Sequence, residues 1–172
     1  EEDFSEVKKF LDGLREQGIT DFRAYFDTNP EEVLRTIRLV KIKRVNQATL
    51  HLYKAPNTEV LLDNLQEIIG PSSHNVIKEQ LITIAENGTA FEAEGSNYTL
   101  EGEEIDVIIR WLVTPGFEKT YSQIMISIWD ITRQKQTEKQ LRLQATALEY
   151  VANAVVVIDA ESKVAWINPA YT

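Results

Sequence analysis

The N-terminal part of the chain has the three-to-four-residue spacing of apolar positions that is typical of helices. Four such residues share one face of a helix predicted over 4–17: Phe4, Val7, Leu11 and Leu14. Residues 19–38 continue as further short helices, the last opened by Asn29 and Pro30. We therefore predict a helical cap over residues 1–38.

The apolar spacing changes at residue 39. Residues 39–45 alternate apolar and basic side chains, which predicts a strand with one solvated face. Short helices are predicted over 47–55 and around residues 60–62. A longer helix is predicted over 74–86, after the break at Gly70-Pro71-Ser72-Ser73.

Three long segments then alternate strongly and are separated by short turns: 90–100, 104–114 and 120–132. An antiparallel meander is the simplest way to connect them. In the second segment, one parity is apolar and should face the core: Ile105, Val107, Ile109, Trp111 and Val113. The predicted fold class is α+β, an antiparallel sheet with short helices on one face.

The third segment has apolar residues on both faces. Ile124, Ile126 and Ile128 share one parity, whereas Met125 and Trp129 lie on the other. We expect this second face to be covered by the N-terminal helix or by a partner chain.

A helix is predicted over 133–153, with a heptad seam of mixed polarity. Its positions are Ile131, Glu138, Ala145 and Ala152, with Gln134, Leu141 and Leu148 offset by three. About three heptads form a weak coiled coil, and a solvated helix packing on its own domain is the alternative. The predicted dimer contacts are Phe4, Val7, Leu11, Leu14, Met125, Trp129, Leu141 and Leu148.

The tail changes character again. Residues 155–159 and 163–168 read as two strands around a turn. Two strands cannot bury a core, so residues 154–172 are interpreted as the truncated start of another domain. We expect this hairpin to be disordered or to pair with a neighbouring edge strand.

Composition narrows the function classes. The chain of 172 residues carries a formal net charge of −9, which disfavours binding to nucleic acid or to an anionic membrane surface. It contains no cysteine, so thiol nucleophiles, thiolate metal sites and disulfides are excluded. No apolar run approaches the ~20 residues of a membrane span, so direct membrane insertion is not expected and a cytoplasmic location is predicted.

Catalytic motifs are also lacking in the sequence. No phosphate loop, nucleophile elbow or zinc-binding helix motif occurs. The two histidines are His51 and His74, and neither belongs to a triad pattern. The Glu-rich turns are interpreted as a solvated rim, and the chain is predicted not to be an enzyme.

Three short motifs resemble those of PAS domains, the small sensory fold of signalling proteins. Asp130-Ile131-Thr132 resembles the junction between a PAS core and its signalling helix, and Asn46-Gln47-Ala48 resembles the family's helix start after a strand. Residues 154–171, which end in Asn168-Pro169-Ala170-Tyr171, resemble the opening of a second PAS domain. The resemblance departs from the family in its first strand, which is missing or degenerate because residues 19–38 read as helices.

The resemblance implies a sensor made of a helical cap (1–38), a PAS-like domain (39–132), a linker helix (133–153) and a truncated second domain (154–172). Family members feed a histidine kinase or a diguanylate cyclase, so the expected partners are a second copy of the chain and an output domain further along it. Asp130, Ile131 and Thr132 would relay the signal.

The resemblance also implies a ligand cavity between the concave sheet face and the helices. Its candidate lining is Tyr53, Leu81, Phe91, Ile109, Trp111, Ile126 and Ile128. No cofactor is assigned, and an unidentified small molecule is left open. Haem is disfavoured because His74 lies in a capping region, and flavin thiol adducts need a cysteine. Two alternatives remain: an interaction domain whose core is filled, chiefly by Trp111, and a small catalyst on a curved sheet.

Overall fold

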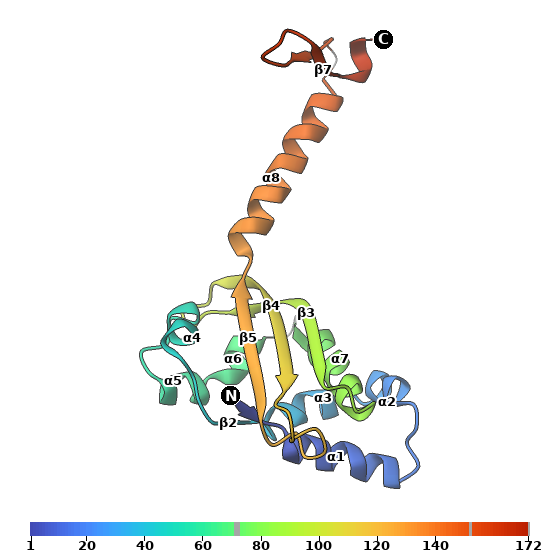
Figure 1. The fold of residues 1–172 in the computed structure, drawn as a ribbon, viewed down its shortest axis with the longest axis vertical. Coiled ribbons are helices and arrows are strands. Elements are labelled where there is room, and N and C mark those ends of the chain that lie inside the picture. The colour runs from blue at the N-terminus through green and yellow to red at the C-terminus, as the bar shows by residue number, and fades with distance from the viewer. Residues whose placement is uncertain (71–72, 152, 172) are drawn as a thin grey trace. The chain divides into compact units, whose positions relative to one another are not determined.

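The computed structural model describes residues 1–70, 73–151 and 153–171 and divides the chain into two compact units, Glu1–Ile131 and Thr132–Thr172. The sequence positions Pro71, Ser72, Ala152 and Thr172 lie outside the described residues. The predicted α+β class is confirmed (Figure 1).

Most helices and strands follow the predicted order, usually with shorter bounds. The strand Glu2–Asp3 and the helix Leu65–Ile69 were not predicted, and the helix predicted around residues 60–62 spans Thr58–Asp63. The helices are α1 (Ser5–Glu16), α2 (Phe22–Thr28), α3 (Pro30–Ile37), α4 (Gln47–Leu52), α5 (Thr58–Asp63), α6 (Leu65–Ile69), α7 (His74–Ala85) and α8 (Thr132–Glu149). The strands are β1 (Glu2–Asp3), β2 (Lys41–Ile42), β3 (Ala90–Tyr98), β4 (Glu104–Val113), β5 (Ile124–Asp130), β6 (Val156–Ile158) and β7 (Val164–Ile167), with a 3-10 turn at Pro169–Tyr171.

Five strands form one antiparallel sheet in the order β2-β1-β5-β4-β3. In the view of Figure 1, α6 and α7 lie behind these strands. The alternation predicted for β4 is confirmed, since Val107 and Trp111 are fully buried while Arg110 and Leu112 are exposed. β1, which the sequence pattern did not predict, pairs with both β2 and β5, so residues before the helical segment also belong to the sheet.

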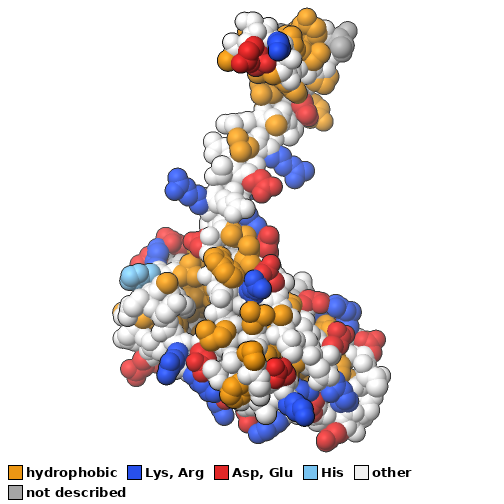
Figure 2. Space-filling view, viewed as in Figure 1, with side chains coloured by type: hydrophobic (Ala, Val, Ile, Leu, Met, Phe, Trp, Pro, Cys, Tyr) orange, Lys and Arg blue, Asp and Glu red, His pale blue; other side chains and the backbone are white. Residues whose placement is uncertain are grey.

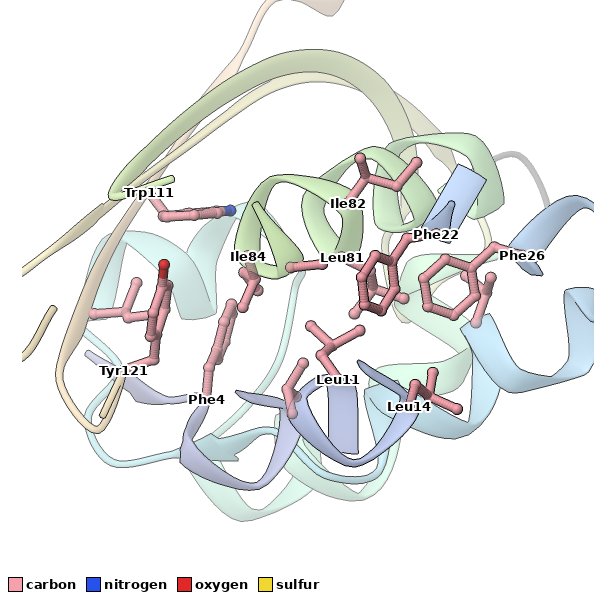
Figure 3. Packing of buried hydrophobic residues seen from close by; sticks show 14 of the residues in the cluster. Phe4, Leu11, Leu14, Phe22, Phe26, Leu81, Ile82, Ile84, Trp111 and Tyr121 are labelled. Atoms are coloured by element: carbon pink, nitrogen blue, oxygen red, sulfur yellow. The ribbon is translucent and has the colours of Figure 1, made fainter. Parts of the chain in front are cut away.

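The apolar stripe of α1 forms part of the main core. Phe4, Val7, Leu11 and Leu14 are all buried, and Phe4 meets the ring of Trp111 edge-on at 6.4 Å between centroids (Figure 3). The prediction that these four residues form a dimer interface is therefore wrong. The stripe packs inside the fold, in one cluster with α2, α7 and the end of β4.

A second, smaller cluster lies under the other half of the sheet. It joins Tyr53 at the end of α4, Leu61 of α5 and Ile68 of α6 to Ile105 and Val107 at the start of β4. A single strand, β4, thus serves both clusters, one at each of its ends.

Gly70 ends α6 with a backbone that only glycine adopts readily. Its φ is +52°, and a Cβ built there would collide with the ring of Tyr98. Gly70→Ala is expected to lower the free energy of unfolding by about 1–3 kcal/mol, because it combines backbone strain with a clash. Urea unfolding followed by circular dichroism measures this.

Gly13 provides the matched control. It lies in the interior of α1 with open space where a Cβ would point. Gly13→Ala should stabilise the fold by about 0.5–1 kcal/mol through helix propensity. Equal effects of the two alanine substitutions would contradict the strain assigned to Gly70.

The second unit consists of α8 and the β6–β7 hairpin. The two strands pair with each other, and the buried side chain of Asn168 ties the hairpin to the chain after α8. Its Nδ2 donates to the carbonyls of Val151 and Asn153, and its Oδ1 accepts from the Val155 N–H at 2.8 Å. Leu141 and Leu148, the predicted dimer contacts of α8, are exposed.

Candidate functional site

A cavity of about 920 Å³ lies in the first unit, lined by residues of both apolar clusters. Phe4, Val7, Leu81 and Ile84 of the main cluster line it, and so do Tyr53, Leu61 and Ile68 of the smaller one. This volume is in the range of sites that take a small organic molecule. The two clusters are thus separated by a space of ligand size.

The register of β4 explains why the cavity lies at mid-strand. Val107 belongs to the smaller cluster and Trp111 to the main one, and Ile109 between them lines the cavity. On β5, the paired residues Ile126 and Ile128 line it as well. The apolar inner face therefore continues along the whole of β4. The helices pack against the two ends of this face, and the cavity lies between them.

Five of the seven predicted lining residues border the cavity: Tyr53, Leu81, Ile109, Ile126 and Ile128. Phe91 and Trp111 do not. Their rings stack on each other at 5.9 Å between centroids within the main cluster. The expectation that Trp111 lines or fills the cavity is wrong, because its ring packs against Phe4 and Phe91 within the main cluster.

One part of the cavity wall carries a polar chain of three side chains. The Asn97 amide on β3 donates to the Tyr53 hydroxyl at 2.7 Å, and both residues are buried. The Ser73 hydroxyl, just before α7, donates to the Ser96 carbonyl at 2.6 Å and lies 3.2 Å from the Asn97 Oδ1. Because the Tyr53 oxygen accepts from Asn97, its own O–H is left to donate elsewhere.

Backbone and ionic contacts hold Tyr53 in place. Its carbonyl accepts from the Leu100 N–H at 3.0 Å. The next residue, Lys54, bonds Glu101 and Glu103 of the β3–β4 turn, each at 2.6 Å. Burial raises the pKa of Tyr53 to about 12, and the charge of Glu2 adds to the shift, so the phenol is protonated at neutral pH.

Glu2 brings a carboxyl group to the same cavity from β1. Burial raises the pKa of this carboxyl to about 7, opposed by the amino group of Glu1. Among the residues that the structure describes, no hydrogen bond or ion pair to the Glu2 carboxyl is found. By contrast, the pKa of Asp3 on the same strand is lowered: burial opposes the shift, but the carboxyl accepts the Ser5 N–H at 2.9 Å and pairs with Lys43 at 3.2 Å.

The sequence pattern did not single out Ser73, Asn97 or Glu2. For Asn97 a signal existed: it has the parity of Phe91 and Ala93 on β3, so a polar amide falls at an inward position. Inward amides usually find a partner. The other two positions gave no such signal.

The histidines lie outside the cavity wall that the described residues form. His51 is exposed, and His74 opens α7 without lining the cavity. Within the described part of the chain, no group of three or more acidic or histidine side chains could hold a metal ion.

The predicted relay residues occupy the end of the sheet. Asp130 is the last residue of β5 and lines the cavity, and α8 begins at Thr132. Between them, Ile131 is buried and its N–H donates to the Asp106 carbonyl at 2.9 Å. The hydrogen-bonded ladder thus extends past β5 to the residue before α8.

The outer face of the sheet carries exposed apolar side chains. Met125 is 53% and Trp129 48% exposed, and they pair across the strands with Leu112 and Ile108. Figure 2 shows hydrophobic side chains gathered over this part of the first unit. The expectation that α1 covers this face is wrong, because the apolar side of α1 packs with Trp111 on the opposite face.

Comparison with known proteins gives no assignment. No protein-family model matches the sequence, and no curated protein matches it. None of the described helices has the length and apolar character that crossing a membrane requires.

Proposed function

We propose that this chain is a PAS-like sensory module that binds a small molecule in the cavity of its first unit. The observation that carries the proposal is the cavity itself, about 920 Å³ between the inner sheet face and the helices. Its wall is mostly apolar, with a few convergent polar groups in Tyr53, Asn97 and Ser73. That combination is typical of small-molecule sites.

The relay would run along β5. This strand borders the cavity from Met125 to Asp130, and one residue separates it from α8. A ligand that shifts β5 changes the strand end from which α8 starts, and differential binding to two such states is what moves an equilibrium. The output would be a histidine kinase or a diguanylate cyclase elsewhere in a longer chain.

A binding experiment with the neutral dye Nile red tests the proposal. The wild-type chain should raise the dye's fluorescence saturably, whereas Ile109→Trp should weaken binding at least about tenfold by filling the cavity. Leu112→Trp adds the same bulk on the outer sheet face and should leave binding unchanged. Ile126→Phe provides a milder filling variant, and circular dichroism verifies folding.

Undiminished Nile red binding by folded Ile109→Trp and Ile126→Phe would overturn the ligand site. A complementary measurement is mass spectrometry of small molecules released when the purified protein is denatured. A defined compound released by the wild type and missing from Ile109→Trp supports the site.

The exposed outer face of the sheet supports a second function, self-association. Replacing both Met125 and Trp129 by serine should shift a dimer towards monomer, because it removes the largest exposed apolar surface of β5. Light scattering over a concentration range measures the mass. Leu34→Ser, at an exposed apolar position on α3, is the control. A wild-type chain that is monomeric throughout would rule the interface out.

The catalyst alternative is supported less well. The Glu2 carboxyl, with its pKa raised to about 7 by burial, is suited to general acid–base work. Tyr53, which lines the same cavity, is not suited to act as a base, since burial raises the pKa of the phenol to about 12. We therefore favour a binding role for both groups.

A further inference from the structure

Charge is unevenly distributed around the cavity. Among the described residues that line it, the ionisable acids are Glu1, Glu2 and Asp130, whereas Arg44 is the one basic side chain. Arg44 is exposed, and no lysine is found among these lining residues. An anionic ligand would therefore lose its hydration without gaining a buried cationic partner.

Among the acids that line the cavity, Glu2 is the one that we expect a ligand to pair with. Its carboxyl borders the cavity, and no described lysine or arginine side chain pairs with it. Burial disfavours the Glu2 carboxylate more than the Glu1 amino group stabilises it, and a cation supplied by a ligand would offset that cost. The Tyr53 oxygen belongs to the wall of the same cavity and has a lone pair that can accept an N–H.

An apolar path leads away from this acid along the inner sheet face. Ile109, Ile126 and Ile128 line the same cavity, with Leu81 and Ile84 of α7. An alkyl chain placed along these side chains would be desolvated, which contributes about 25 cal/mol per Å² of buried apolar area.

We propose that the cavity takes a cationic amphiphile, a protonated amine with an apolar body, whose ammonium group pairs with Glu2 and bonds Tyr53. This inference rests on the proposed ligand-binding function and specifies its ligand class. The charged and titratable groups that line the cavity together with Glu2 are Glu1, Arg44, Tyr53 and Asp130, and the amino group of Glu1 lowers the pKa of Glu2 against the effect of burial.

The test uses three probes that share one eight-carbon chain: n-octylammonium, n-octanol and n-octanoate. Isothermal titration calorimetry at pH 8 should give octylammonium an affinity at least about tenfold above octanoate, with octanol between them. The octylammonium affinity should fall several-fold between pH 8 and pH 5, because the Glu2 carboxyl becomes protonated in that interval.

Two variants assign the preference to Glu2. Glu2→Gln should remove most of the discrimination between octylammonium and octanoate while octanol binding is retained. Glu16→Gln removes a carboxylate from the exposed end of α1 and should leave the discrimination intact. Tyr53→Phe should weaken octylammonium more than octanol.

The outcomes separate this inference from the function on which it rests. Octanoate binding as tightly as octylammonium, or a discrimination that survives Glu2→Gln, would overturn the amine preference and leave the ligand site standing. If none of the three probes binds and Nile red does not bind either, the ligand site itself is refuted.

Discussion

Replacing Leu11 by alanine is expected to lower the free energy of unfolding of the first unit by about 2–5 kcal/mol. Leu11 has no solvent-exposed surface and packs in the main cluster with α7 and Trp111. Removing its side chain deletes apolar contacts and leaves a space that a close-packed core refills only in part. Urea unfolding monitored by circular dichroism gives the change.

The control for Leu11→Ala is Leu141→Ala on α8. Leu141 is 60% exposed, so its truncation should change stability by no more than about 0.5 kcal/mol. If the stripe of α1 were instead a dimer interface, Leu11→Ala would change the protein's mass in light scattering and barely affect dilute-solution stability. That result would contradict the core position of α1.

Replacing Glu2 by glutamine is expected to remove a pH-dependent destabilisation of about 3 kcal/mol, the equivalent of a pKa raised from 4.5 to about 7. Because the folded-state pKa is the higher one, the folded protein holds this proton more tightly than the unfolded chain. The contribution of Glu2 to the free energy of unfolding of the wild type is thus highest below pH 4.5, falls as pH rises to about 7, and levels off above that value.

The measurement compares urea unfolding of wild type and Glu2→Gln at pH 4.5 and pH 8. The stability difference, variant minus wild type, should rise by about 3 kcal/mol between the two pH values. Its absolute size at either pH also contains the cost of burying an amide. Glu16→Gln on the exposed end of α1 should show no comparable rise, and a parallel pH response of Glu2→Gln and wild type would contradict the raised pKa of the half-buried Glu2 carboxyl.

The sheet and its inner face were the predictable part of this protein. The parity of β4 is decisive, because Val107 and Trp111 alternate with Arg110 and Leu112 over a strand of 10 residues. An alternation of this length is compatible with only one choice of which side chains face the core and which face outward. The same logic found Ile126 and Ile128, which line the cavity.

What covers each face could not be read from the pattern. The spacing of Leu11 and Leu14 shows that one side of α1 is buried, but an apolar stripe has the same appearance against a core as against a partner chain. In the same way, the alternation along β4 predicts that Trp111 is on the inner face of the sheet. It does not predict at which point along β4 the cavity lies between the sheet and the helices. That position depends on which helix meets which end of the strand.

Glu2 illustrates a different limit. β1 has 2 residues, too few for any period, and its pairing with Ile42 and Ile124 depends on contacts far along the chain. The raised pKa of its carboxyl follows from that tertiary position alone. The inward position of Asn97 could have been predicted, because Asn97 lies on the same face of β3 as Phe91.

The separation of the two apolar clusters has a consequence for cooperativity. Val107 and Trp111 anchor opposite ends of β4 in different clusters, with the cavity between them. Each half can then open with its own protection against amide exchange, as subglobal units do in other proteins. A molecule that fills the cavity contacts both halves and makes them open together. Amide hydrogen exchange would then show one common level of protection in the bound protein, in place of two different levels in the free protein.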